Sequence, residues 1–302
     1  MKSRTIVGLP VTRRIWACLL VALLALAGTC LLPTVAHASS TTTLVVQVRQ
    51  DNAAATSMLK RINTQRKKNG LVKLKLDKEL TSAAITRAAE VAVYMPLESP
   101  HRRPDGRLAR TVNGRVSYEC CAESTNCSES MIVDSWMDSL SHRAGILLQS
   151  ARSVGIACVT VGKSYQMYEN QQVWILEFSS TATKATPPTK GRKTYTKKVR
   201  MANANVKAGK FAVTDRIMGF KKTVPLERGD SCEMNPTFKS KRTAWATEIS
   251  PKSFTWKSSN PSVASVNRNG VIKGKKRGTT VITGKLKNGL GRQVKIRVKV
   301  TE

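Results

Sequence analysis

The chain has 302 residues, of which 51 are lysine or arginine and 19 are aspartate or glutamate, so its formal net charge is +32. This length is sufficient for two domains of ordinary size. Beyond one apolar run near the N-terminus, no segment is long and apolar enough to cross a bilayer, which excludes a protein with several membrane spans.

Residues 1–38 have the pattern of a secretory signal peptide. Four basic residues precede the apolar run at 15–32, and Ala36-His37-Ala38 forms an A-x-A cleavage site. A retained signal anchor is the alternative, because the apolar run is nearly long enough to span a bilayer. We expect cleavage after Ala38, a secreted protein that can be retained on the cell wall, and no membrane span after cleavage. Residues 39–52 are then expected to be a short leader.

Two helices are predicted after this leader. The first begins near Ala53 and ends before Gly70, a residue type that commonly follows the last turn of a helix. The second spans residues 77–95. Apolar residues recur at helical spacing in both segments and are expected to form the buried faces: Met58, Leu59, Ile62, Leu80, Ala84, Ala88 and Val91.

The next segment is mixed in character. Residues 96–127 are rich in proline and glycine and are predicted to be irregular. Ser128 is a suitable N-cap for a third helix, and a short helical turn follows at 142–151. Residues 153–161 and 171–178 are predicted strands, the first apolar on both faces and therefore buried between layers. The third helix is expected to bury an apolar stripe formed by Met131, Ile132 and Trp136.

A change of composition divides the chain. Residues 181–212 are polar, basic and contain paired prolines, which is typical of a linker. From residue 213 to 302 the apolar periodicity is two, and turn residues separate short strands. Asn269-Gly270 and Asn288-Gly289 are strong hairpin signals. The sequence therefore predicts an N-terminal α+β domain and a small all-β sandwich.

Five cysteines follow the predicted cleavage site: Cys120, Cys121, Cys127, Cys158 and Cys232. Export would permit disulfides, and an odd number leaves at least one thiol unpaired or intermolecular. The paired spacing of a cysteine zinc site is absent. A disulfide among the first four is open, with no connectivity readable, and a thiol nucleophile at Cys120-Cys121 is a further alternative.

Several ordered motifs make residues 53–180 resemble the bacterial CAP (SCP-like) superfamily of cysteine-rich secretory, antigen and pathogenesis-related proteins. The resemblance implies an α-β-α sandwich with a cleft. The motifs are MLKRINTQRKKNGLVKLKLDKELTSAAITRAAE (58–90), HRRPDGR (101–107), YECC (118–121), SWMDSLSHRAGIL (135–147), SVGIACV and VWILEF.

The same resemblance implies a site. His101 and His142 match the two histidines of the family and Glu119 matches its first glutamate. Two imidazoles could hold zinc or another divalent metal and the carboxylate could orient a bound water, although no cofactor is certain. The chain departs from the family pattern where a second glutamate is replaced by Ser139, and where Glu177 lies beside a position that is commonly glutamine.

Residues 254–284, FTWKSSNPSVASVNRNGVIKGKKRGTTVITG, resemble the bacterial Ig-like domain of group 2. The expected fold is therefore a CAP α-β-α sandwich followed by a small all-β Ig-like sandwich, with the second domain at 213–302. The resemblance covers the tryptophan, the Ser-Ser-Asn turn and the Val-Ala-x-Val strand of that family.

Positive charge is concentrated in the C-terminal part, where residues 185–302 hold 28 Lys/Arg against 6 Asp/Glu. Such a field attracts polyanions, with solubility alone as the alternative. For an exported protein we expect an anionic cell-wall polymer or a host glycan rather than nucleic acid. Two basic runs are candidates for this contact: Lys273, Lys275, Lys276 and Arg277, and Lys295, Arg297 and Lys299.

Together these features predict a secreted, basic binding or adhesion protein of the bacterial surface. An enzyme is less well supported, because no glycine-flanked nucleophile accompanies the two histidines. The alternative is a metal-assisted hydrolase of peptide or cell-wall substrates, with His101 and His142 as ligands and Glu119 as general base. The sequence indicates neither the ligand nor the oligomeric state.

Overall fold

The structure is a computed structural model that describes residues 40–95, 101–161, 171–187, 189–215, 223–243, 246–288 and 290–302. The predicted signal peptide and its cleavage site lie outside these residues, as does the glycine of the predicted Asn288-Gly289 turn. Within the described ranges, no helix combines the length and apolar character needed to cross a membrane.

The described chain contains fifteen strands, five α-helices and two short 3-10 helices. In chain order they are β1 (Thr41–Asp51), α1 (Asn52–Lys68), β2 (Lys75–Leu76), α2 (Lys78–Val93), η1 (Ala109–Val112), β3 (Tyr118–Thr125), α3 (Glu129–Asp138), α4 (Leu140–Ile146), β4 (Ser153–Val161), β5 (Gln171–Ser179), β6 (Arg192–Ala202), α5 (Asn203–Ala208), β7 (Lys210–Asp215), β8 (Thr223–Glu227), β9 (Ser231–Lys239), β10 (Thr247–Glu248), η2 (Pro251–Ser253), β11 (Phe254–Ser258), β12 (Ala264–Val266), β13 (Val271–Gly274), β14 (Gly278–Leu286) and β15 (Gln293–Thr301).

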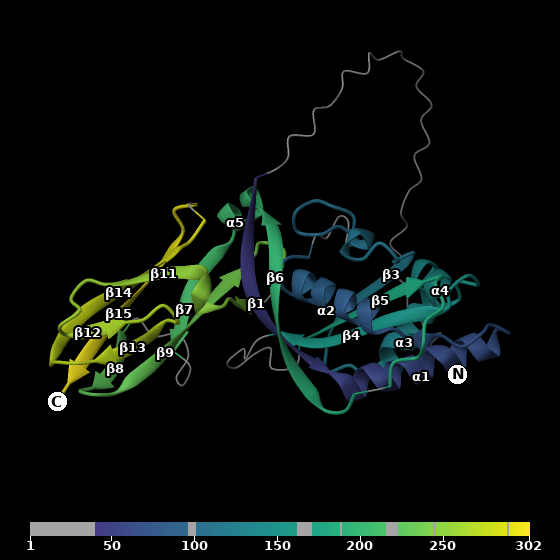
Figure 1. The fold of residues 1–302 in the computed structure, drawn as a ribbon, viewed down its shortest axis with the longest axis horizontal. Coiled ribbons are helices and arrows are strands. Elements are labelled where there is room, and N and C mark those ends of the chain that lie inside the picture. Colours follow the sequence, from purple (N-terminus) through teal and green to yellow (C-terminus); the bar gives the residue numbers. More distant parts are fainter. Residues whose placement is uncertain are drawn as a thin grey trace, which may run out of the picture. The chain divides into compact units, whose positions relative to one another are not determined.

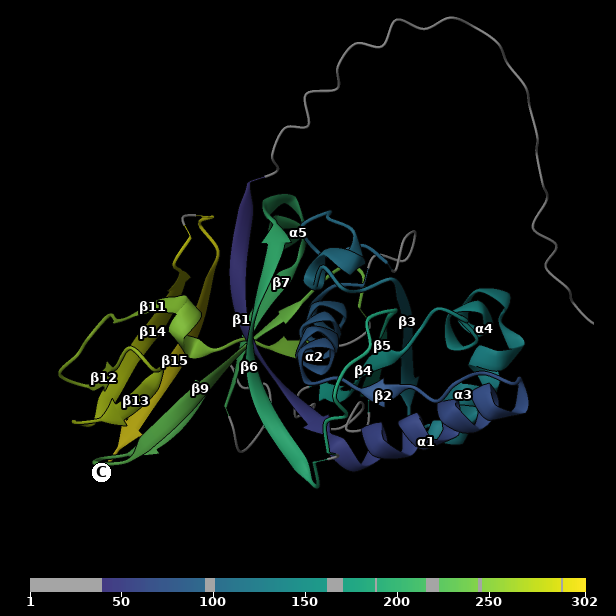
Figure 2. The same cartoon turned by 45° about the vertical axis from the view of Figure 1, so that its right-hand side comes forward.

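The N-terminal part is an α-β-α sandwich around one sheet. Its strands have the order β3-β5-β4-β1-β6, and the short β2 pairs with β4. Helix α2 covers one face, while α1, α3 and α4 cover the other (Figures 1 and 2). β4 and β5 are buried between these layers, which is why both read as nearly continuous apolar runs. The predicted α+β fold class is confirmed.

The helices agree with their sequence signals. Asp51 caps α1 and Asp77 caps α2, each accepting a hydrogen bond from a backbone amide in the first turn. Gly70 follows α1 with a φ of +69°, as the predicted helix end requires. In α3, however, Met131 is 58% exposed, so its place in the predicted apolar stripe was wrong.

Three segments differ from the sequence predictions. Residues 39–52, expected to be a leader, contain β1, and residues 96–127, expected to be irregular, contain η1 and β3. The expected linker at 181–212 contains β6, α5 and the start of β7. β1 and β6 pair antiparallel from Thr41 with Ala202 to Asp51 with Arg192. The exposed, charged side chains of β6 conceal an edge strand that pairs with β1 along its whole length.

The C-terminal part is all-β, as predicted. One sheet has the order β10-β9-β13-β12 with β7 also on β9, and the other has the order β11-β14-β15-β8. Apolar side chains from both sheets form a common core, including Met234, Ile272, Ile282 and Val298. Gly270 has a φ of +75° in the turn between β12 and β13, so this predicted hairpin is confirmed.

Candidate functional site

The buried face of α2 carries two opposite charges. Arg87 and Glu90 are both fully buried and lie three residues apart, and Arg87 Nη1 is 2.8 Å from Glu90 Oε2. The rest of this helix face is mainly alanine and valine. A buried charge is costly unless it is paired, so this arginine must find further acceptors in the surrounding layers.

The second partner of Arg87 comes from the sheet. Glu119 on β3 accepts two hydrogen bonds, from Arg87 Nε at 2.8 Å and from Arg87 Nη2 at 3.2 Å. This two-pronged contact matches the planar guanidinium to the carboxylate and joins helix to sheet. Burial by itself would lower the pKa of Arg87, but the charges of Glu119 and Glu90 raise it well above its usual value.

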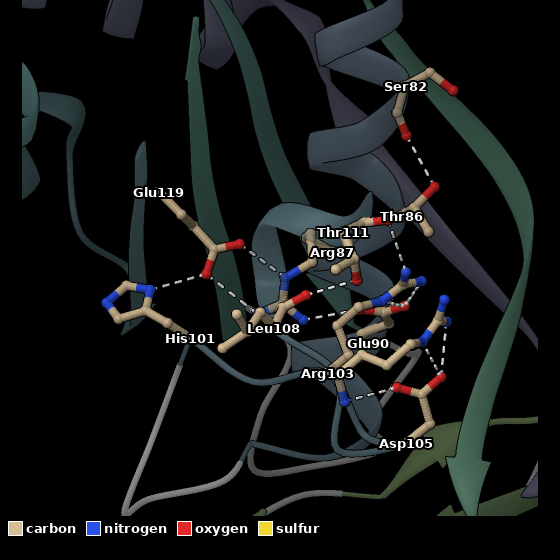
Figure 3. Close-up of polar contacts among 11 residues, drawn as sticks. Ser82, Thr86, Arg87, Glu90, His101, Arg103, Asp105, Leu108, Thr111 and Glu119 are labelled. Atoms are coloured by element: carbon tan, nitrogen blue, oxygen red, sulfur yellow. Dashed lines mark hydrogen bonds and ion pairs between the residues drawn. The ribbon is translucent and has the colours of Figure 1, made fainter. Parts of the chain in front are cut away.

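His101 completes the chain of contacts from the loop side. Its Nδ1 is 3.0 Å from Glu119 Oε1, and half of its side chain is exposed to solvent. In the same loop, Arg103 forms an ion pair with Glu90. Figure 3 shows these groups as one connected network that runs from exposed imidazole to buried helix. Burial would raise the pKa of Glu119, but the His101 hydrogen bond and the Arg87 charge lower it.

Glu177 is a second buried carboxyl group beside Glu119. The two are direct cross-strand partners in the β3–β5 ladder, so their side chains point to the same face. Both carboxyl oxygens of Glu177 are buried, and no donor group of another residue forms a hydrogen bond to either of them. Burial, and then the charge of Glu119, raise the pKa of Glu177 well above its usual value. A protonated Glu177 can donate to the ionised Glu119.

His142 has different partners. It lies on α4, where its Nδ1 is 2.9 Å from the Ser139 hydroxyl and its ring stacks on Trp136 with centroids 5.9 Å apart. Burial lowers the pKa of His142; a hydrogen bond with the Cys121 backbone opposes this, and the charge of His101 adds to it. Ser139 stands where the family pattern has a glutamate, and its hydroxyl orients the imidazole of His142.

The predicted metal ligands do not form a metal site in the described part of the chain. No group of three or more His, Cys, Asp and Glu side chains there is arranged to hold an ion. Glu119 is already engaged on both oxygens by Arg87 and His101, and the Nδ1 of His142 faces a hydroxyl. The described residues bring no third protein ligand to the two histidines, so the arrangement lacks the three or four protein ligands of a typical zinc site.

The five cysteines of the described residues are free thiols. Cys120 and Cys121 are neighbours on one strand and point to opposite faces, so they pack in different cores. The structure therefore has no disulfide among Cys120, Cys121, Cys127 and Cys158, the pairing that the sequence left open. Burial raises the pKa of Cys120, Cys121 and Cys158 far above that of a reactive thiol, which disfavours the nucleophile alternative.

Sequence reasoning did not assign a role to Arg87, Glu90 or Arg103, nor to Glu177 as a partner of Glu119. The sequence did contain a signal for the role of Arg87. Arg87 lies seven residues after Leu80, on the apolar stripe of the second predicted helix, where a charged residue requires a buried partner.

The basic residues of the Ig-like part divide between its two sheets. On β15, exposed and buried residues alternate, so Lys295, Arg297 and Lys299 share the outer face of the sheet β11-β14-β15-β8. The register pairs Lys295 with Thr283, and Thr283 with Lys257. The complete exposed set on this face, called here the basic sheet face, is Lys257, Lys285, Lys295, Arg297 and Lys299.

The other nominated run lies elsewhere. Lys273 is exposed on β13, in the opposite sheet, and Lys275 and Lys276 lie in the connection from β13 to β14. Arg277 Nη1 is 3.3 Å from Glu302 Oε1, so part of its charge is compensated. Lys257 and Lys285 of the basic sheet face were missed because their alignment with β15 depends on strand register.

The fold defines the class of protein as an α-β-α sandwich joined to an Ig-like β-sandwich. Residues 59–178 match the sequence model of the cysteine-rich secretory protein family, CAP, and residues 237–296 match the bacterial Ig-like domain of group 2. The chain thus contains a CAP domain followed by a bacterial Ig-like domain, as the motifs predicted.

Solved structures with some similarity include an outer surface protein of Borrelia burgdorferi, 16% identical, covering 42% of this chain and 92% of that one with a TM-score of 0.33. A cysteine-rich secretory protein of Staphylococcus aureus is 18% identical, with 44% and 40% covered and a TM-score of 0.31. An extracellular SCP-domain protein of Bacillus anthracis is 16% identical, with 42% and 41% covered and a TM-score of 0.32. The chain thus spans about two fifths of the last two. No curated protein matches it.

Proposed function

We propose that this is an exported binding protein that attaches to an anionic polymer, a cell-wall polymer or a host glycan, through the basic sheet face of its Ig-like domain. The observation that carries the proposal is the alignment of five exposed cations on one face of a sheet. Among the four strands of that sheet, the one acidic residue is Glu227, at the end of β8. None of the five cations has an ion-pair partner among the described residues.

The CAP domain serves in this proposal as a second binding module rather than as an enzyme. Arg87, Glu90, Glu119 and His101 form ion pairs with one another, so their charged groups are not free to act on a substrate. Of these four side chains, only His101 is exposed to solvent to a large extent. For the metal-assisted hydrolase alternative, the described residues bring no third protein ligand to His101 and His142, and this favours the binding role in the proposal.

The test is binding of the whole protein to a purified anionic polymer, such as teichoic acid or heparin, measured by surface plasmon resonance. Glutamine replaces all five cations of the basic sheet face. The matched control removes five exposed lysines elsewhere by the same substitution: Lys184, Lys190, Lys198, Lys207 and Lys210.

At about 0.5 kcal/mol for each exposed contact, the basic-sheet-face variant should lose about 2.5 kcal/mol of binding free energy, roughly 70-fold in affinity. The control variant has the same net charge and should lose about threefold or less. Equal losses in both variants would show that overall charge, and not this face, governs attachment.

A further inference from the structure

A groove runs between α1 and α3 on the surface of the CAP domain. It encloses about 390 Å³ and lies on the sandwich face opposite to the Arg87 network. Val133 is the one apolar residue in its lining, and it belongs to the buried core in which Met58 and Ile62 of α1 and Ile132 of α3 also lie. The volume is within the range of small-molecule sites, about 300–1,000 Å³.

The groove wall contributed by α1 is cationic. Lys60, Arg61 and Lys68 line it at spacings that place them along one side of the helix. All three are exposed, and none has an ion-pair partner among the described residues. Asp134 of α3 is the one carboxylate in the lining. The site therefore has a net positive charge of two, with one carboxylate acceptor on the opposite wall.

Polar side chains between these charges have unused hydrogen-bonding capacity. Ser57 and Gln65 are half-buried in the lining, and neither side chain has a hydrogen-bond partner among the described residues. Thr64 donates its hydroxyl proton to the Lys60 carbonyl at 3.0 Å, which leaves its oxygen as an acceptor. Apolar ligands bind in pockets with mainly hydrophobic linings. Because the lining of this groove is mainly polar, the groove suits a polar ligand better than an apolar one.

We propose that this groove binds an acidic sugar unit, one that carries a carboxylate or sulfate group on a hydroxyl-rich ring. The cations of α1 would hold the anionic group, in which Arg61 offers a two-pronged contact. Asp134 and Gln65 would accept and donate hydrogen bonds to ring hydroxyls. A bare inorganic anion fits less well. The Asp134 carboxylate would repel it, and the anion would be too small to use the Gln65 amide and the Ser57 and Thr64 hydroxyls as well as the cations.

This site shares no residue with the basic sheet face, so it does not rest on the function proposed above. The test uses the whole protein labelled with ¹⁵N, so that amide signals report each site separately. The probes are a sulfated uronic acid–glucosamine disaccharide and inorganic sulfate. Titration with the disaccharide should shift the amides of residues 57–68 and 130–134, whatever happens in β14 and β15.

Three variants decide the interpretation. The triple variant K60Q/R61Q/K68Q should weaken disaccharide binding at least tenfold. The control variant K67Q/K73Q/K75Q removes three exposed charges outside the groove and should weaken it less than twofold. Asp134→Ala should weaken the disaccharide about fivefold and strengthen the binding of inorganic sulfate.

Absence of shifts in residues 57–68 and 130–134 would overturn the site. Equal effects of the two triple variants would also overturn it, because they would reduce the contact to net charge. Stronger binding of both probes by Asp134→Ala would overturn the assignment to a sugar, since the carboxylate would then act only as a repulsive charge.

Discussion

At the scale of single residues, Glu177 is the most unusual group in the CAP domain. It is fully buried, it faces a second carboxyl group across the ladder, and neither oxygen has a donor other than its own proton. Its folded-state pKa is raised by burial and by Glu119, so folding takes up a proton there at pH values where an unfolded glutamate is ionised. The stability that depends on this proton is complete below a pH of about 4.3 and decreases as the pH rises through the folded pKa.

Glu177→Gln imitates the protonated state at every pH. We expect it to raise the free energy of unfolding at pH 8 by about 1–3 kcal/mol, because no buried carboxylate has to be protonated or left unpaired. At pH 4 the variant and the parent should be nearly equal. Urea unfolding between pH 4 and pH 9 measures both, with the exposed Glu227→Gln as control. A variant that is less stable at pH 8 would show that the ionised carboxylate is favoured in the fold.

Arg66 is the other buried charge with a structural role. It is fully buried on α1 and donates to the backbone carbonyls of Val72, Ile146, Leu148 and Ala151, at 2.8 to 3.2 Å. These acceptors lie in the turn after α1 and in the segment around the end of α4. One guanidinium therefore holds two loops against the helix.

Arg66→Met keeps most of the side-chain volume and leaves four carbonyl groups without this donor. We expect a loss of more than about 3 kcal/mol in the free energy of unfolding, since hydrogen bonds from a charged donor contribute about 1.5–3 kcal/mol each. Lys67→Met, at the exposed next position, should change it by about 0.5 kcal/mol or less. Similar values for the two variants in thermal or urea unfolding would contradict this role.

The candidate site was only partly predictable at this scale. Family motifs nominated His101 and Glu119, which the structure places in contact. They could not show that Arg87 occupies the same carboxylate, because that depends on how α2 packs on β3. They also could not show that His142 forms a hydrogen bond with Ser139 and stacks on Trp136. Both contacts depend on how α3 and α4 meet at Ser139.

At the scale of elements, regular periodicity identified the long helices and two of the buried strands. Both long helices and the strands at 153–161 and 171–178 follow the predicted ranges closely. β1 was missed although Leu44, Val46 and Val48 are buried at a spacing of two. β6 has only Val199 and Met201 as fully buried residues, so its pattern was too weak to separate it from a linker.

The pairing of β6 with β1 leads to a prediction for limited trypsin digestion of the region proposed to join the two domains. Cleavage after Lys184 or Lys190, which are exposed and outside helices and strands, should precede cleavage after Lys197, Lys198 or Arg200. Proteases need an accessible backbone that can be drawn into their active site, and β6 is held to β1 by a ladder that runs its whole length. Mass spectrometry of early fragments gives the order. Early cuts within β6 would show that this strand opens easily and that the whole segment behaves as a linker.

At the scale of the whole molecule, the charge is unevenly distributed along the chain. Residues 185–302 carry most of the excess, and within them the sheet register separates two sets of cations. The cations of the basic sheet face share one sheet surface and have no ion-pair partner among the described residues, whereas the set formed by Lys273, Lys275, Lys276 and Arg277 includes one residue paired with Glu302. The two sets therefore differ in geometry as well as in position.

Attachment to a polyanion should depend strongly on salt if charge summed over a surface supplies the affinity. The Debye length falls from about 10 Å at 0.1 M to about 3 Å at 1 M salt, so binding should be almost abolished at the higher concentration. Reversing Lys295, Arg297 and Lys299 to glutamate should weaken binding at 0.1 M salt more than reversing Lys273, Lys275 and Lys276. The number of charges is matched, and only the first three share one face. Both variants should keep the circular dichroism spectrum of the parent, because all six side chains are exposed. Binding that persists at 1 M salt, or that is lost equally in the two variants, would show that the basic residues keep the protein soluble and do not form a specific binding face.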